Sequence, residues 1–96
     1  MEYRVARDQA GQAVHLTPIE HRILEVLVRH AERIVTVPVL LREVWGPERD
    51  DARGLRVYIG SLRRKIEVDP SRPQHILTEL GVGYRLVIET EPQVEN

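Results

Sequence analysis

The stretch that decides the fold is Leu55–Glu67, which reads LRVYIGSLRRKIE. A helix advances by about 100° per residue, so the apolar residues of this stretch fall on one side and predict a stripe packed against a core. That stripe consists of Leu55, Tyr58, Ile59, Leu62 and Ile66. The other side, which we call the arginine face, consists of Arg56, Val57, Gly60, Ser61, Arg63 and Arg64. The stretch is therefore predicted to be a helix that buries one side and offers the other to an anionic molecule.

The positive charge of this helix is concentrated. Residues 52–66 include five cationic side chains and no acidic one, whereas a solvated helix usually mixes signs for i,i+4 pairing. Gly60 costs about 1 kcal/mol of helix propensity relative to Ala, which indicates that a molecule approaches closely there. The alternative is an ordinary solvated face, with a packing neighbour as the reason for Gly60. We interpret the segment as a DNA-recognition helix.

The composition narrows the class of protein. The 96 residues are 42% hydrophobic, with one Trp and no Phe, which predicts one small domain with a modest aliphatic core and no cofactor-sized cavity. The net charge of −1 argues against a protein that coats nucleic acid nonspecifically. A local basic patch is compatible with that charge, because the residues outside 52–66 then carry −6. Lys65 is the only lysine, and arginine favours bidentate contacts to phosphate or guanine.

The sequence offers little support for an enzyme, a metal site or a cofactor. Without cysteine there is no disulfide, thiolate ligand or thiol nucleophile. Ser61 and Ser71 lack a glycine-rich elbow and a base partner. The histidines, none at metal-ligand spacing, are His15, His21, His30 and His75. The chain has no signal-peptide pattern and no apolar run near the ~20 residues of a membrane span, so we expect a cytoplasmic protein.

The N-terminal half predicts a hairpin followed by a helix. Tyr3–Ala6 and Ala13–Leu16 are strand candidates around a turn-rich segment. Thr17–Glu20 then supplies a complete helix start, with Thr as N-cap, Pro at the first helical position and Glu closing a capping box. This first helix is expected to end near His30.

A second helix and a terminal hairpin complete the layout. Thr36 is predicted to cap the second helix after a short extended link, and Gly46 and Pro47 end it. His75–Leu80 and Tyr84–Ile88 are predicted to pair across a glycine-rich turn. Three helices and a hairpin form the winged-helix layout, which places one domain over residues 1–88 and a disordered polar tail over residues 89–96.

Four motifs together resemble the DNA-binding effector domain of OmpR/PhoB-type response regulators. They are Leu16–Glu20, Val44–Gly46, Leu55–Lys65 and Gly81–Arg85, within a match that spans residues 13–88. The resemblance implies an α+β winged helix-turn-helix, with N-terminal antiparallel strands, a three-helix body, a C-terminal β-hairpin wing, helix three in the major groove and the wing near the minor groove. Since the family has four N-terminal strands and only two are evident, we expect the chain to begin inside that sheet, downstream of a receiver domain.

A narrower similarity and the site residues follow from the same resemblance. Four segments are most similar to the branch that regulates a potassium-uptake operon: Trp45–Pro47, Leu55–Gly60, Asp69–Pro73 and His75–Gly83. The resemblance implies that bases are faced by Arg56, Val57, Gly60, Ser61 and Arg64. It implies that the DNA backbone is contacted by Trp45, Arg53, Arg63, Thr78 and Tyr84. It further implies that RNA polymerase is engaged by a loop that includes Glu48, Arg49, Asp50 and Asp51.

Some positions depart from the family pattern or allow a second interpretation. Leu80 stands where relatives often carry a wing-tip arginine, and Val37 where a basic phosphate contact is common. Gly60 and Ser61 replace bulkier polar residues. From helical position alone, Val57 could be a partly covered core residue, and Trp45 could be a core anchor that also reaches a phosphate.

The expected partner is double-stranded DNA, bound by a chain that is a monomer in solution and forms a pair on half-sites about one helical turn apart. The alternative function is that of a winged helix that binds only proteins, and the arginine face argues against it.

Overall fold

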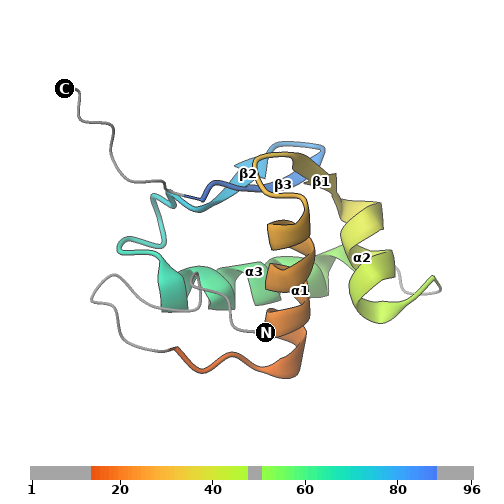
Figure 1. Cartoon of the computed structure of the whole chain (residues 1–96), viewed down its shortest axis with the longest axis horizontal. Coiled ribbons are helices and arrows are strands. Elements are labelled where there is room, and N and C mark those ends of the chain that lie inside the picture. The colour runs from red at the N-terminus through yellow and green to blue at the C-terminus, as the bar shows by residue number, and fades with distance from the viewer. Residues whose placement is uncertain (1–13, 48–50, 89–96) are drawn as a thin grey trace.

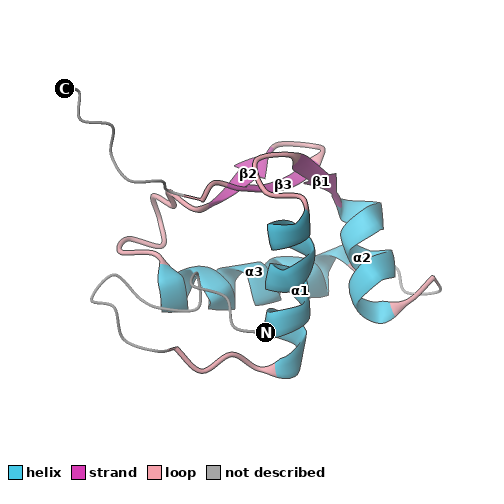
Figure 2. Ribbon diagram, in the orientation of Figure 1, coloured by secondary structure: helices cyan, strands magenta, loops and turns pink. Residues whose placement is uncertain are grey.

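The described part of the chain, residues 14–47 and 51–88 of the computed structural model, contains three helices and a three-stranded sheet. In chain order the elements are α1 (Pro18–Arg29), β1 (Ile34–Thr36), α2 (Val37–Trp45), α3 (Ala52–Ile66), β2 (Ile76–Glu79) and β3 (Gly83–Leu86). The helices lie together and the sheet covers the C-terminal end of α1 (Figures 1 and 2). The predicted winged-helix order of elements is confirmed.

The first two helices begin where local side chains bind their free N–H groups. Thr17 Oγ1 accepts the Glu20 N–H at 3.2 Å, and Glu20 Oε1 accepts the Thr17 N–H at 2.9 Å, which confirms the capping box. Thr36 Oγ1 accepts the Val39 N–H at 3.4 Å at the start of α2. The second helix ends at Gly46, whose φ of 111° favours glycine.

The sheet has the order β1-β3-β2, with both pairs antiparallel. The β2–β3 hairpin is the predicted wing, and β1 pairs with its inner strand through the register Val35↔Tyr84. The predicted extended link before the second helix is therefore a strand. Gly83 is required at this pairing, because a Cβ there would collide with the carbonyl oxygen of Val35. Gly81, with φ of 75°, forms the turn of the hairpin.

A single apolar core joins the helices to the sheet. Every helix contributes residues that are at most 4% exposed, and the sheet adds one from β1 and three from the wing. The core consists of Ile23, Leu24, Val26, Leu27, Val35, Leu40, Leu41, Val44, Leu55, Ile59, Leu62, Ile66, Ile76, Tyr84 and Leu86. The rings of Trp45 and Tyr58 pack together, with centroids 5.8 Å apart.

The predicted N-terminal hairpin is only partly covered by the described residues. Residues 14–16 of the expected strand Ala13–Leu16 are not a strand. Here the His15 carbonyl accepts a hydrogen bond from the Lys65 ammonium at 2.9 Å. Strand pairing would use the same carbonyl. Tyr3–Ala6 and the tail 89–96 lie outside the described residues. Within the described ranges, no helix is long and apolar enough to cross a membrane.

Candidate nucleic-acid interface

The third helix has the two-sided character that the sequence predicts. Leu55, Ile59, Leu62 and Ile66 are at most 3% exposed, which confirms the core stripe apart from Tyr58, which is partly buried. On the arginine face, Arg56 and Arg64 are exposed and Val57 is 63% exposed. The interpretation of Val57 as a covered core residue is therefore wrong.

The middle of the arginine face is open because Gly60 has no side chain. A Cβ built at Gly60 would meet only Arg64 Nη1, at 3.7 Å. That is an ordinary contact with the end of a flexible side chain, so no packing neighbour within the described residues requires glycine at this position. An open, cationic surface thus lies between Arg56 and Arg64, with Val57 as its apolar member.

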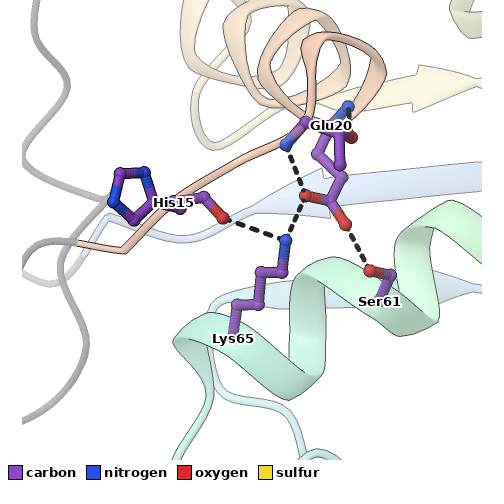
Figure 3. Close-up of polar contacts among 5 residues, drawn as sticks. His15, Glu20, Ser61 and Lys65 are labelled. Atoms are coloured by element: carbon purple, nitrogen blue, oxygen red, sulfur yellow. Dashed lines mark hydrogen bonds and ion pairs between the residues drawn. The ribbon is translucent and has the colours of Figure 1, made fainter.

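Ser61 is turned away from this surface toward α1. Its hydroxyl donates to Oε2 of Glu20, at the first turn of α1 (Figure 3). Ser61 is thus predicted to face a base, yet its hydroxyl is already bound within the protein. A period of 100° per residue places Ser61 at the edge of the arginine face. Its hydroxyl points toward α1 because the Glu20 carboxylate accepts its hydrogen bond.

The Glu20 carboxylate is only 2% exposed and joins α1 to α3. Besides Ser61, it receives the Lys65 ammonium at 2.7 Å and the Thr17 N–H at 2.9 Å (Figure 3). Burial by itself would raise the pKa of Glu20, but the hydrogen bonds from Lys65, Ser61 and Thr17 outweigh burial and hold the pKa below its ordinary value. The sequence indicated only the capping role, since it gave no sign that α3 crosses this turn.

Three of the residues predicted to contact the DNA backbone converge where α3 meets the wing. Arg63 donates to Thr78 Oγ1 at 2.7 Å, and its guanidinium lies 5.9 Å from the centre of the Tyr84 ring. Arg63 also donates to the Ile76 carbonyl from Nε at 3.0 Å and from Nη2 at 2.7 Å. Burial raises the pKa of the Tyr84 phenol, opposed by the positive charges of Arg63 and Arg56. The arrangement joins a half-buried cation to the Thr78 hydroxyl and to the face of the Tyr84 ring.

The remaining predicted contacts lie elsewhere. Trp45 is partly buried at the end of α2 and packs against the core, which supports its interpretation as a core anchor. Arg53 is exposed in the first turn of α3. Asp51 caps this helix, since its Oδ1 accepts the Gly54 N–H at 2.8 Å. The other members of the predicted polymerase loop, residues 48–50, lie outside the described residues.

The tip of the wing is apolar. Leu80 is 90% exposed and Val82 is 46% exposed. The wing's own cation, Arg85, donates to Glu79 at 2.9 Å and is neutralised by it. The described residues of the wing therefore present no unpaired arginine at the tip, as the departure at Leu80 predicts.

The described residues include no group of three or more metal-ligating side chains placed to hold an ion. The spacing of the four histidines in the sequence is not that of metal ligands.

The sequence matches the family described as "Transcriptional regulatory protein, C terminal" over residues 11–86. It is 49% identical over 78 residues to the KDP operon transcriptional regulatory protein KdpE of Escherichia coli K12, covering 80% of this chain and 35% of that protein. The chain thus spans about a third of the length of this relative. The similarity to OmpR/PhoB-type regulators, and to KdpE among them, is confirmed.

Two solved structures show the same fold. The response regulator DrrB of Thermotoga maritima, an OmpR/PhoB homolog, superposes with a TM-score of 0.73 at 36% identity, over 80% of this chain and 35% of that one. The RstA DNA-binding domain of Klebsiella pneumoniae, solved in complex with the RstA box, gives 0.71 at 28% identity, over 83% of this chain and 80% of that one.

Proposed function

The chain belongs to the family of C-terminal domains of transcriptional regulatory proteins, a family of DNA-binding effector domains and not of enzymes, and from this premise we propose that it binds a specific duplex sequence with α3 in the major groove. The observation that carries the proposal is the open, cationic surface between Arg56 and Arg64. The RstA domain, which has the same fold and is solved in complex with the RstA box, supports duplex binding.

Each open residue of this surface suits a contact in the major groove. Arg56 and Arg64 lie two turns apart on exposed positions and can each bind guanine or a phosphate in bidentate fashion. Val57 can pack against a thymine methyl group, and Gly60 lets the helix backbone approach closely. Ser61 would contact a base only by giving up its hydrogen bond to Glu20, so we expect it to contribute least.

We propose that the junction of α3 and the wing binds a phosphate. Arg63, Thr78 and Tyr84 meet there, and Arg63 Nη1 makes no hydrogen bond within the described residues. A phosphate oxygen could accept from this nitrogen without displacing the bonds to the wing. Trp45, at the end of α2, and Arg53, in the first turn of α3, are the other proposed backbone contacts.

Further proposals concern the longer protein. The identity to KdpE supports control of a potassium-uptake operon, a receiver domain upstream and a cytoplasmic location. We also propose that RNA polymerase contacts the loop formed by Glu48, Arg49, Asp50 and Asp51, and that two copies of a chain monomeric in solution pair on DNA half-sites.

The binding proposal is tested by selecting bound duplexes from a random pool and measuring affinity at several salt concentrations. We expect a defined consensus, and an affinity that falls with salt by a slope near −0.9 per neutralised phosphate. A salt-independent affinity, or enrichment of no sequence, would support the alternative of a protein-binding winged helix. The double variant Arg56→Ala/Arg64→Ala should enrich no duplex sequence. Its cooperative unfolding would show that the fold is kept.

The polymerase proposal needs variants that spare the helix cap. Replacing Glu48, Arg49 and Asp50 with alanine while keeping Asp51 should lower transcription in a reconstituted system and leave affinity for the selected duplex nearly unchanged. An equal loss of affinity and transcription would show that the loop contacts DNA.

A further inference from the structure

Glu67, the residue that follows α3, is a buried acid in an unusual place. Glu67 is only 7% exposed. It lies at the C-terminus of α3, the negative end of the helix dipole, where cations are favoured. Burial and the dipole both disfavour a carboxylate there. The acid is therefore expected to have compensating donors.

The compensating donors come from the segment that leads into the wing. Glu67 Oε1 accepts the Gln74 N–H at 2.9 Å and the His75 N–H at 3.2 Å. Oε2 accepts the His75 N–H at 3.0 Å and the Ile76 N–H at 2.8 Å. Three consecutive N–H groups thus surround one carboxylate, which is the arrangement that backbone nests use to hold anions.

Arg63, one turn earlier on the same side of α3, binds the other backbone group of the same strand residue. The Ile76 carbonyl accepts from Arg63 Nε and Nη2, while the Ile76 N–H donates to Glu67. Ile76 opens β2, the outer strand that pairs only with β3 in the described sheet. The side chains of Arg63 and Glu67 therefore occupy the edge groups that a further strand would otherwise use.

We propose that Glu67 is a positioning residue for duplex binding. Together with Arg63 it fixes the wing to α3, so that helix and wing meet the duplex as one rigid surface. This inference rests on the proposed function. Once α3 has bound the duplex, a wing held rigidly against it contacts the DNA at high effective concentration. A loosened wing must instead be ordered during binding, which costs affinity.

The first measurement tests the attachment without DNA. In Glu67→Gln, an amide replaces one accepting oxygen with a donor, so hydrogen exchange at the Gln74, His75 and Ile76 amides should accelerate. Asp69→Asn is the matched control. It removes the same charge two residues away, and within the described residues Asp69 Oδ1 binds only the nearby Ser71, at 3.1 Å to N and 2.7 Å to Oγ. In this control, exchange at the three amides should be unchanged.

The second measurement tests the consequence, using the consensus duplex selected by the wild-type chain. Glu67→Gln should lower affinity at fixed salt by about tenfold or more. It should also lose hydroxyl-radical protection of the duplex backbone on the wing side, while the base preferences set by α3 persist. Asp69→Asn should keep both. If Glu67→Gln does not fold, Glu67→Asp replaces it in both measurements. The aspartate retains the charge but is too short to reach all three N–H groups, so it should show the same changes to a smaller degree.

The outcomes separate the two proposals. If the wild-type chain selects no duplex, the proposed function fails and this inference fails with it. If the wild type binds and the Glu67 variants exchange faster but keep the wild-type affinity and footprint, only the inference is overturned. A shift of base preference as large as the loss of wing protection would overturn it too, since Glu67 would then act on the helix itself.

Discussion

The ammonium nitrogen of Lys65 lies 2.7 Å from Oε1 of Glu20, and this ion pair joins the last turn of α3 to the first turn of α1. One turn earlier on α3, Ser61 donates to the other oxygen of the same carboxylate. Because i and i+4 residues share a side of a helix, one buried acid holds two successive turns. The rotation of α3, and hence the direction of its arginine face, depends on this contact.

Replacing Glu20 should therefore destabilise the fold. Glu20→Gln keeps the shape but removes the charge that accepts from Lys65, Ser61 and Thr17, so we expect the free energy of unfolding to fall by about 1–3 kcal/mol. Chemical denaturation at neutral pH measures it. The control is Glu43→Gln, whose side chain is 39% exposed and pairs with Arg29 at 3.9 Å. That change should stay within about 0.5 kcal/mol, and equal losses in the two variants would contradict the assigned role.

The same carboxylate should make stability depend on acid pH. The pKa of Glu20 is lower in the folded chain than its ordinary value, so as pH falls the unfolded chain binds this proton first. The stabilisation is complete above the unfolded pKa of about 4.3 and is lost as pH falls through the lower folded pKa. We expect denaturation curves between neutral pH and about pH 3 to show a steeper acid loss in the wild type than in Glu20→Gln. Parallel curves would rule out this linkage.

Asp51 should act as a helix cap whatever it contacts in a transcription complex. Asp51→Ala removes the acceptor of the Gly54 N–H and should cost about 0.5–2 kcal/mol of stability. Asp51→Asn retains an accepting oxygen and should cost less. Thermal or chemical unfolding of both variants measures the difference, and an Asn variant as unstable as the Ala variant would indicate that the charge matters more than the cap.

The features that the sequence predicted well depend on residues close together in the chain. The starts of α1 and α2 need a threonine and a donor three residues later, and both form as expected. The core stripe of α3 follows from helical period alone. The strand β1 could not be predicted from the short apolar pair Ile34–Val35, because its partner β3 lies about fifty residues further along the chain.

The parts of the site that the sequence missed depend on which helix crosses which. Ser61 belongs to the arginine face by period, yet Glu20 turns its hydroxyl toward α1. Arg63 is predicted to contact a phosphate, but the sequence does not indicate that it also binds the wing through Ile76 and Thr78. Both outcomes depend on tertiary contacts between residues thirteen or more positions apart, which periodicity does not contain.

The two neighbouring arginines of α3 should have different effects on DNA binding. Arg64 is exposed beside Gly60, so Arg64→Ala should relax preference at one or two base positions by about 1–3 kcal/mol if the side chain binds guanine in bidentate fashion. Arg63 is half-buried against the wing, so Arg63→Ala should weaken binding to all sequences similarly and reduce the salt slope by about one.

A panel of single-base variants of the selected duplex, titrated with both proteins at fixed salt, distinguishes these effects. Arg29→Ala removes the same charge from the exposed side of α1 and serves as the control for net charge, with little expected change in preference or affinity. Base discrimination arises from contacts to base edges, whereas phosphate contacts act on every sequence. If Arg63→Ala alters base preference and Arg64→Ala does not, α3 lies in the groove with a different rotation from the one that its exposed face indicates.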